Sequence, residues 1–296
     1  MFFELWSVMA PVFICTAIGY CWARSSTPYS AEFVSRIVMN IGAPCLVIST
    51  ISKVEVSGQE FYAVAFAALL IFLGTAILGM LALRISGGSI RALLPTVVFP
   101  NNGNMGLPLC LFAFGEQGLA LALAFFLVQM AALMSGGAAL MSRSNKGFRV
   151  ALKDLAFLPL VHSIIIAIFL LGTGATLPGW IDSTLGLLGG LTIPLMLITL
   201  GVSLANLTTA GWGRSIIFSL LRIGGGFAFA CMVVQILGLS GTAKHVVLLQ
   251  SIMPAAVFNY LLALKFDRDP NEVAGVVVTS TLLSLLVIPV LLYFLL

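Results

Sequence analysis

Charged residues are scarce in this sequence. Only 8% of its 296 residues are Asp, Glu, Lys or Arg, whereas 60% are hydrophobic. Soluble domains carry about 25% charged residues, so the composition excludes an ordinary water-soluble protein. It also leaves little length for a soluble domain, because a membrane span needs roughly 20 apolar residues and ten such spans would use most of the chain. We therefore expect an all-α integral membrane protein.

Signatures of enzymes, metal sites and nucleic-acid binding are also missing. The five cysteines lie in or beside apolar segments without metal-ligand spacing, so we expect reduced packing residues. The sequence contains no HExxH, G-x-S-x-G or Walker motif, and the acidic stretch 267–272 has Glu272 where a calcium loop needs glycine. The net charge of +4 is spread over predicted helix ends. We expect no enzymatic activity, no metal, no cofactor and no nucleic-acid partner.

Carboxylates are absent from the middle of every apolar run. Glu116, the nearest, lies at a predicted helix end. Proton and cation carriers normally keep an ionisable side chain inside the membrane. Its absence favours an anionic substrate, and coupling to sodium held by carbonyls, Asn and hydroxyls stays open as an alternative.

Apolar runs of spanning length predict ten transmembrane helices. The first begins with Glu4 rather than with a basic cluster, so we expect a retained helix and not a signal peptide. The ten runs fall near residues 4–22, 33–52, 61–83, 92–114, 118–141, 156–174, 183–206, 214–238, 243–266 and 272–296.

Basic residues are distributed asymmetrically over the ends of these runs. If the amino terminus lies outside the cell, only Lys53 and Lys244 among the 14 Lys and Arg residues face outward. Cytoplasmic loops of membrane proteins carry an excess of Lys and Arg. We therefore expect an inner or plasma membrane protein with both termini outside, periplasmic in a bacterium. For Arg222, inside a predicted span, two explanations are open: snorkelling to the inner surface, or a role near an anion path.

Prolines recur at similar places in the two halves of the chain. Pro44 and Pro194 begin similar apolar runs, and Pro100 and Pro254 interrupt two others. Because each half holds five spans, the second must enter the membrane from the opposite side, which predicts an inverted 5+5 repeat. Two proline matches can also arise by chance in so apolar a chain. The predicted division is a first repeat over 1–141, a cytoplasmic connection over 142–155 and an inverted repeat over 156–296.

The fourth and ninth spans are predicted to be broken helices. Residues 99–109 read FPNNGNMGLPL, in which Pro100 removes a backbone donor and Gly103 tolerates non-helical dihedral angles. Pro254 is expected to break the ninth span in the same way. Each second half-helix then presents unpaired N–H groups near the midplane, which suits a carboxylate. The candidate substrate-binding residues at the two breaks are Asn101, Asn102, Asn104, Asn259 and Tyr260.

The motif PN-x(3)-MG-x-P at 100–108, with NIGAPCLVIST at 40–50 and the proline in the ninth span, resembles the auxin efflux carrier family. That family includes plant PIN proteins and bacterial carriers for malonate and other organic acids. The resemblance implies a fold like that of NhaA and the bile-acid transporters, with a scaffold from spans one, two, six and seven and a transport unit from the others. It implies a substrate-site role for Asn101 and Gln129, crossover roles for Pro100 and Pro254, and a homodimer through the scaffold.

These observations predict a secondary-active or facilitative transporter of a small organic anion, such as an auxin-like carboxylate or a dicarboxylate. The site is expected at the midplane crossover, with access alternating between the two sides. A passive anion channel, a membrane sensor, and a sodium- or proton-coupled carrier of another small solute are the alternatives. The expected partners are the anion, the lipid bilayer and a second copy of the chain.

Overall fold

The computed structural model describes residues 2–25, 27–52, 57–137, 140, 157, 159–173, 175–207 and 212–296. Over these residues the regular elements are helices, with one isolated β-bridge. The predicted connection 142–155 lies outside the described residues.

The first half of the chain forms long apolar helices separated by polar caps. Ser30 and Ser57 each accept a hydrogen bond from the backbone N–H three residues on, which satisfies a donor that the first turn leaves open. Gly87, with a φ of 68°, ends a 29-residue helix in the left-handed conformation typical of a glycine cap. The elements are α1 (Phe2–Arg24), α2 (Ala31–Ile37), the π-helical turn η1 (Val38–Gly42), α3 (Ala43–Ile51), α4 (Gly58–Ser86), α5 (Ile90–Val98), η2 (Asn102–Gly106), α6 (Leu107–Ala132) and η3 (Leu133–Gly137).

The second half contains the remaining helices and a tight acidic turn. Asp267 and Asp269 both adopt positive φ, 52° and 43°, and Pro270 follows at the first position of the last helix, where its missing N–H leaves no bond unmade. The elements are α9 (Pro159–Thr173), α10 (Gly179–Gly190), α11 (Thr192–Asn206), α12 (Trp212–Leu220), η4 (Leu221–Gly225), α13 (Gly226–Ile236), α14 (Gly241–Ser251), α15 (Val257–Phe266) and α16 (Pro270–Leu295).

Seven helical segments of the described residues are long and apolar enough to cross a membrane. Helix α9, with 15 residues, and the pieces of the broken spans α5, α14 and α15 are shorter than that. The predicted fourth and fifth spans run together from η2 to η3, with a kink at Gly115, where φ is 65° and ψ is −161°. The all-helical, multi-pass prediction agrees with these segments, and the count of ten spans and the inverted repeat stay predictions.

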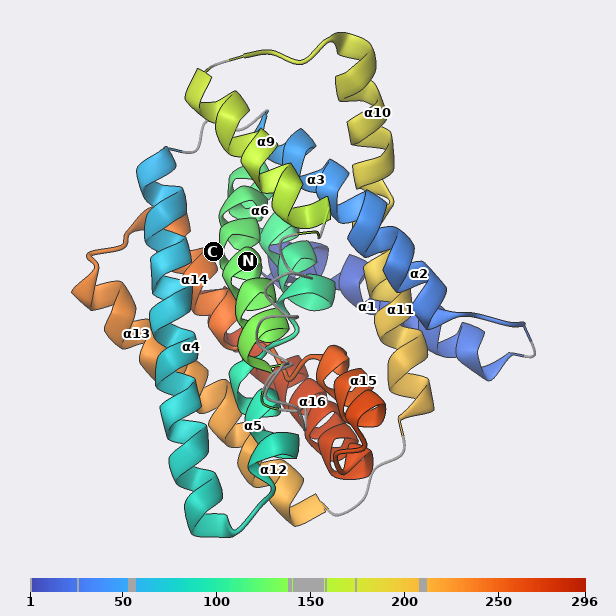
Figure 1. Cartoon of the computed structure of the whole chain (residues 1–296), viewed down its shortest axis with the longest axis vertical. Helices are drawn as coiled ribbons and strands as arrows, with labels where there is room; N and C mark the ends of the chain where they lie inside the picture. The colour runs from blue at the N-terminus through green and yellow to red at the C-terminus, as the bar shows by residue number, and fades with distance from the viewer. Residues whose placement is uncertain are drawn as a thin grey trace.

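The helices pack into two groups. One consists of α1, α2, η1, α3, α9, α10 and α11, at the upper right of Figure 1, and the other of α4 to η3 and α12 to α16. Within the first group α1 lies against α11, where a Cβ added to Gly19 or Gly201 would overlap the backbone of the opposite helix. The groups meet where α1, α3 and α11 contact α6, η2, α15 and α16. The spans in the two groups are those that the family resemblance assigns to a scaffold and to a transport unit, and these two roles stay predictions.

The turns between helices gather at two ends of the molecule. The turns before α2, α5 and α16 lie at the right and bottom of Figure 1, whereas those before α10 and α14 lie at its top and left. At the first end Arg214 forms an ion pair of 2.7 Å with Glu272, which joins α12 to α16. The arrangement places the predicted inward and outward turns at different ends.

Candidate functional site

Two interrupted helices cross in the second group. Helix α5 ends at Val98 and η2 begins at Asn102, while α14 ends at Ser251 and α15 begins at Val257. Phe99 is extended, with φ of −104° and ψ of 100°, as expected for a residue that precedes proline. Both breaks therefore occur at the prolines that the sequence singled out, Pro100 and Pro254.

The two breaks pair with each other as a short antiparallel bridge between Pro100 and Ala255. The N–H of Asn101 donates to the carbonyl of Pro254 at 2.6 Å, and the N–H of Ala256 donates to the carbonyl of Phe99 at 3.1 Å. A backbone group left unpaired in hydrocarbon costs several kcal/mol, so this pairing is what allows extended chain at membrane depth.

Side chains satisfy further backbone groups of the crossing. The Nε2 of Gln129 in α6 donates to the carbonyl of Pro100 at 2.6 Å, and the Nδ2 of Asn259 in α15 donates to the carbonyl of Phe99 at 3.0 Å. The hydroxyl of Ser280 in α16 accepts from the N–H of Ala255 at 3.0 Å. Gln129 and Asn259 thus hold the backbone in place through their amide nitrogens, which leaves only their amide oxygens unpaired.

Arg222, in η4, is fully buried beneath the crossing. Its Nη1 donates to the carbonyls of Val97 and, at 3.0 Å, Val98, and its Nη2 donates to the carbonyl of Ser251 at 2.8 Å. These carbonyls lie in the last turns of α5 and α14, which lack intrahelical donors. The snorkelling explanation for Arg222 is wrong, because a side chain that reached the inner surface would be exposed and would not cap two helices.

The second half-helices begin without side-chain caps. Asn101 precedes η2 and Ala256 precedes α15, and neither accepts a capping hydrogen bond through its side chain. The Nδ2 of Asn101 is buried and has no hydrogen-bond partner among the described residues. The unpaired first N–H groups of both helices and the Nδ2 of Asn101 therefore offer hydrogen-bond donors at the same place.

A cavity of about 240 Å³ opens beside these helix starts. It lies between the two groups of helices, with walls from α2, η1 and α11 on one side and from the crossing, α6, η3 and α15 on the other. None of the described side chains that line it is charged. Its lining residues are Ala31, Ser35, Val38, Met39, Pro100, Asn101, Gly103, Asn104, Phe126, Gln129, Met130, Leu133, Met134, Met196, Thr199, Ser203, Ala256, Val257, Phe258 and Leu261.

The structure brings most of the predicted site residues to this cavity. Pro100, Asn101, Gly103, Asn104 and Gln129 line it. The other predicted residues do not: Asn102, Asn259 and Pro254 are buried in the crossing, and Tyr260 packs partly buried against the hydrophobic core.

Sequence reasoning missed the apolar part of the wall. Four methionines, Met39, Met130, Met134 and Met196, and two phenylalanines, Phe126 and Phe258, line the cavity. The spacing of Phe126, Met130 and Met134, four residues apart along one helix, is a signal that could have placed them on one face. The methionines from α2–η1 and α11 carry no such signal, because they reach the cavity only through packing between distant segments.

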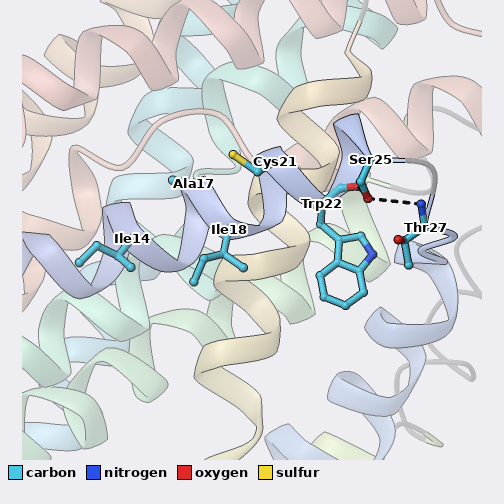
Figure 2. Close-up of a pocket in the computed structure, with 7 residues that line it drawn as sticks. All are labelled: Ile14, Ala17, Ile18, Cys21, Trp22, Ser25 and Thr27. Atoms are coloured by element: carbon cyan, nitrogen blue, oxygen red, sulfur yellow. Dashed lines mark hydrogen bonds between the residues drawn. The ribbon is translucent and has the colours of Figure 1, made fainter.

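A second hollow, of about 560 Å³, lies on the outer side of α1. Figure 2 shows its lining side chains projecting from one helix and the turn after it, with a hydrogen bond from the N–H of Thr27 to the hydroxyl of Ser25. Its walls are mainly apolar, among them Ile14, Ile18 and Trp22. Ligand sites combine apolar walls with a few convergent polar groups, so the cavity at the crossing is the better candidate.

Comparison with known proteins agrees with a transport role. A sequence model of the family described as "Membrane transport protein" matches residues 5–292. The chain is 30% identical over 272 residues to an uncharacterized transporter of Methanocaldococcus jannaschii, covering 87% of each chain. It is 26% identical over 275 residues to an uncharacterized transporter of Methanothermobacter thermautotrophicus, covering 88% of this chain and 87% of the other.

Proposed function

The chain belongs to this membrane transport protein family, which confirms its resemblance to the auxin efflux carriers, and on this premise we propose that it carries a small organic anion across the cell membrane by alternating access. The family is one of transporters and not of enzymes, in line with the absence of catalytic motifs from the sequence.

The observation that carries the proposal is the pair of uncapped helix starts beside the cavity. Each helix N-terminus carries a partial charge of roughly +0.5, and its open N–H groups donate to an anion without a basic side chain in contact with it. Asn101 adds an unpaired amide donor at the same point. A carboxylate placed there accepts hydrogen bonds from both sources.

The remaining residues of the cavity wall favour a substrate with an apolar group next to its carboxylate. Methionine side chains are flexible and polarizable and adapt to ligands of different shape. The hydroxyls of Ser35, Thr199 and Ser203 are the polar groups on the opposite wall. We expect a carboxylate attached to an aromatic or branched aliphatic group, with the carboxylate at the crossing and the body against the methionines.

The position of the cavity supports alternating access. Its walls come from both groups of helices, so a displacement of the second group past the first would carry the crossing, and any bound anion, from one side of the membrane to the other. The bridge and Arg222 join the half-helices within the second group, so they would move as one unit. Both termini are proposed to lie outside, as the distribution of basic residues predicts.

Thermal unfolding of the purified protein tests the proposal. Phenylacetate, hexanoate, malonate and succinate are compared in sodium and in choline buffers, with phenylacetamide as the uncharged control for phenylacetate. A ligand at 100 times its dissociation constant stabilises the folded state by about 2.7 kcal/mol. We expect the melting temperature to rise with phenylacetate or hexanoate and not with phenylacetamide.

Uptake of radiolabelled phenylacetate into proteoliposomes then distinguishes transport from binding. Saturable uptake that unlabelled phenylacetate suppresses is the expected result. Uptake that rises linearly with concentration would indicate a channel. The absence of both stabilisation and uptake for every carboxylate would overturn the proposed substrate class.

A further inference from the structure

Arg222 places a full positive charge inside the transport unit. A guanidinium group stays protonated in proteins, and a buried charge is costly unless it is paired. Among the described residues no carboxylate forms an ion pair with Arg222, in contrast to Arg214, which pairs with Glu272. Its partners are backbone carbonyls of α5 and α14, so its charge faces the negative ends of two helix dipoles.

The charges at the crossing can be added. The ends of α5 and α14 contribute roughly −0.5 each, and the starts of η2 and α15 contribute roughly +0.5 each. These four partial charges cancel, so a crossing made of backbone alone would favour neither anions nor cations. Arg222 neutralises the two negative ends, and about one positive charge remains on the side where the cavity lies.

We propose that Arg222 is a specificity-determining residue, because its charge gives the crossing a net charge of about +1 and thereby selects a substrate with a single negative charge. The inference rests on the proposed function in that it names the residue and the charge class behind anion selection. Arg222 acts from behind the crossing, since the cavity is lined by other residues.

The geometry allows this influence without contact. The break Phe99–Asn101 separates the end of α5 from the start of η2, so the two helix ends lie within about 15 Å of each other along the chain. Charges in a protein interior are screened far less than in water. A purely structural clamp of the same shape would hold the helices together without distinguishing a charged ligand from an uncharged one.

Ligands that share a shape but differ in charge test whether Arg222 acts through its charge. Dissociation constants for phenylacetate, phenylacetamide and phenylmalonate are measured by calorimetry on the parent, Arg222→Gln, Arg222→Lys and the control Arg214→Gln, which removes an equal charge from a partly exposed position of the same span. We expect the parent to prefer the monoanion phenylacetate over both other probes. Arg222→Gln should lose roughly tenfold or more of the preference over phenylacetamide, whereas Arg222→Lys and Arg214→Gln keep it.

Two results would overturn the inference. One is an Arg222→Gln protein that melts cooperatively and discriminates as the parent does. The other is an Arg222→Lys protein that loses discrimination, because the charge is then not what matters. If Arg222→Gln does not fold, loss of discrimination in Arg222→Lys still overturns the inference.

The effect of salts on the melting temperature, measured without substrate, tests the inference independently of the proposed function. In Arg222→Gln the carbonyls of Val97, Val98 and Ser251 lose their cation, so sodium chloride should raise the melting temperature of this variant more than choline chloride does. The parent and Arg214→Gln should respond equally to the two salts. If the parent binds none of the probes but this sodium response is seen, the anion proposal and the specificity role fail, and only the neutralisation of the two helix ends by Arg222 stands. Equal responses to both salts in Arg222→Gln would overturn the charge role itself.

Discussion

At the scale of single residues, Asn101 combines three properties. Its N–H closes the bridge to Pro254, its side chain lines the cavity, and its Nδ2 has no hydrogen-bond partner among the described residues. Asn101→Ala removes the amide and keeps the backbone bond, so the fold should survive while phenylacetate binds roughly ten- to hundredfold more weakly. Calorimetry measures the affinity, and Asn206→Ala, at an exposed position, is the control. Unchanged affinity in a folded Asn101→Ala protein would exclude Asn101 from the binding site.

Gly226 provides the space that Arg222 needs. A Cβ at Gly226 would overlap Nη2 of Arg222 and the carbonyl oxygen of Ser251, whereas a Cβ at Gly224 meets nothing within 4 Å. Gly226→Ala should therefore lower the stability by about 1–3 kcal/mol, the typical effect of overpacking. Gly224→Ala should be neutral or slightly stabilising, since alanine favours helix. Melting temperatures of the two variants check this, and equal values would show that the contact between α13 and α14 adjusts easily.

At the scale of elements, the crossing depends on support from the neighbouring helix α6. Gln129→Met keeps the size of the side chain but removes the donor to the carbonyl of Pro100. An unsatisfied buried carbonyl should lower the stability by about 1–3 kcal/mol and weaken phenylacetate binding as the break loosens. Melting temperature and affinity are measured together. Gln235→Met, on the exposed side of α13, should change neither. Full stability of Gln129→Met would mean that the bridge and the other side chains at the crossing hold the break without Gln129.

The breaks were predictable from sequence because proline acts locally. Pro100 removes a donor and restricts Phe99, and the asparagines and glycine that follow it favour a break, whereas α5 continues through the isolated Pro95. The roles of Gln129, Asn259 and Arg222 follow from contacts across 29 to 160 residues of sequence. Residue type and hydropathy do not contain this information. For Arg222 the sequence left two explanations open, and its burial excludes snorkelling, while the role near an anion path stays a proposal.

The helix bounds show the same difference between features that local sequence determines and features that it does not. The apolar runs located the long helices, since a membrane requires continuous apolar length. They did not predict the π-helical turns η1 to η4, which have no signature in hydropathy. The boundary between the fourth and fifth predicted spans falls at Gly115, whose non-helical φ of 65° and ψ of −161° lie in a region that is essentially restricted to glycine.

At the scale of the whole molecule, the orientation can be tested with a pair of Ser→Cys variants. Ser25 lies in the turn after α1, and Ser240 immediately precedes α14, and both are exposed. In a background without native cysteines, a membrane-impermeant maleimide should label Ser240→Cys in intact cells, because the basic residues place that end outside. Ser25→Cys should react only after permeabilisation. The opposite pattern would reverse the orientation and put both termini in the cytoplasm.

The crossing between the two breaks also determines the order in which the two halves of the chain can fold during synthesis. The carbonyls of Val97 to Phe99 enter the membrane long before their partners exist, because Arg222 and Asn259 are made about 125 and 160 residues later. At roughly 5–20 residues per second, translation leaves these carbonyls unpaired for about six to thirty seconds. Unpaired backbone is not tolerated in lipid, so the first half has to wait against protein or water. The second half is therefore the folding partner that releases the first into the bilayer.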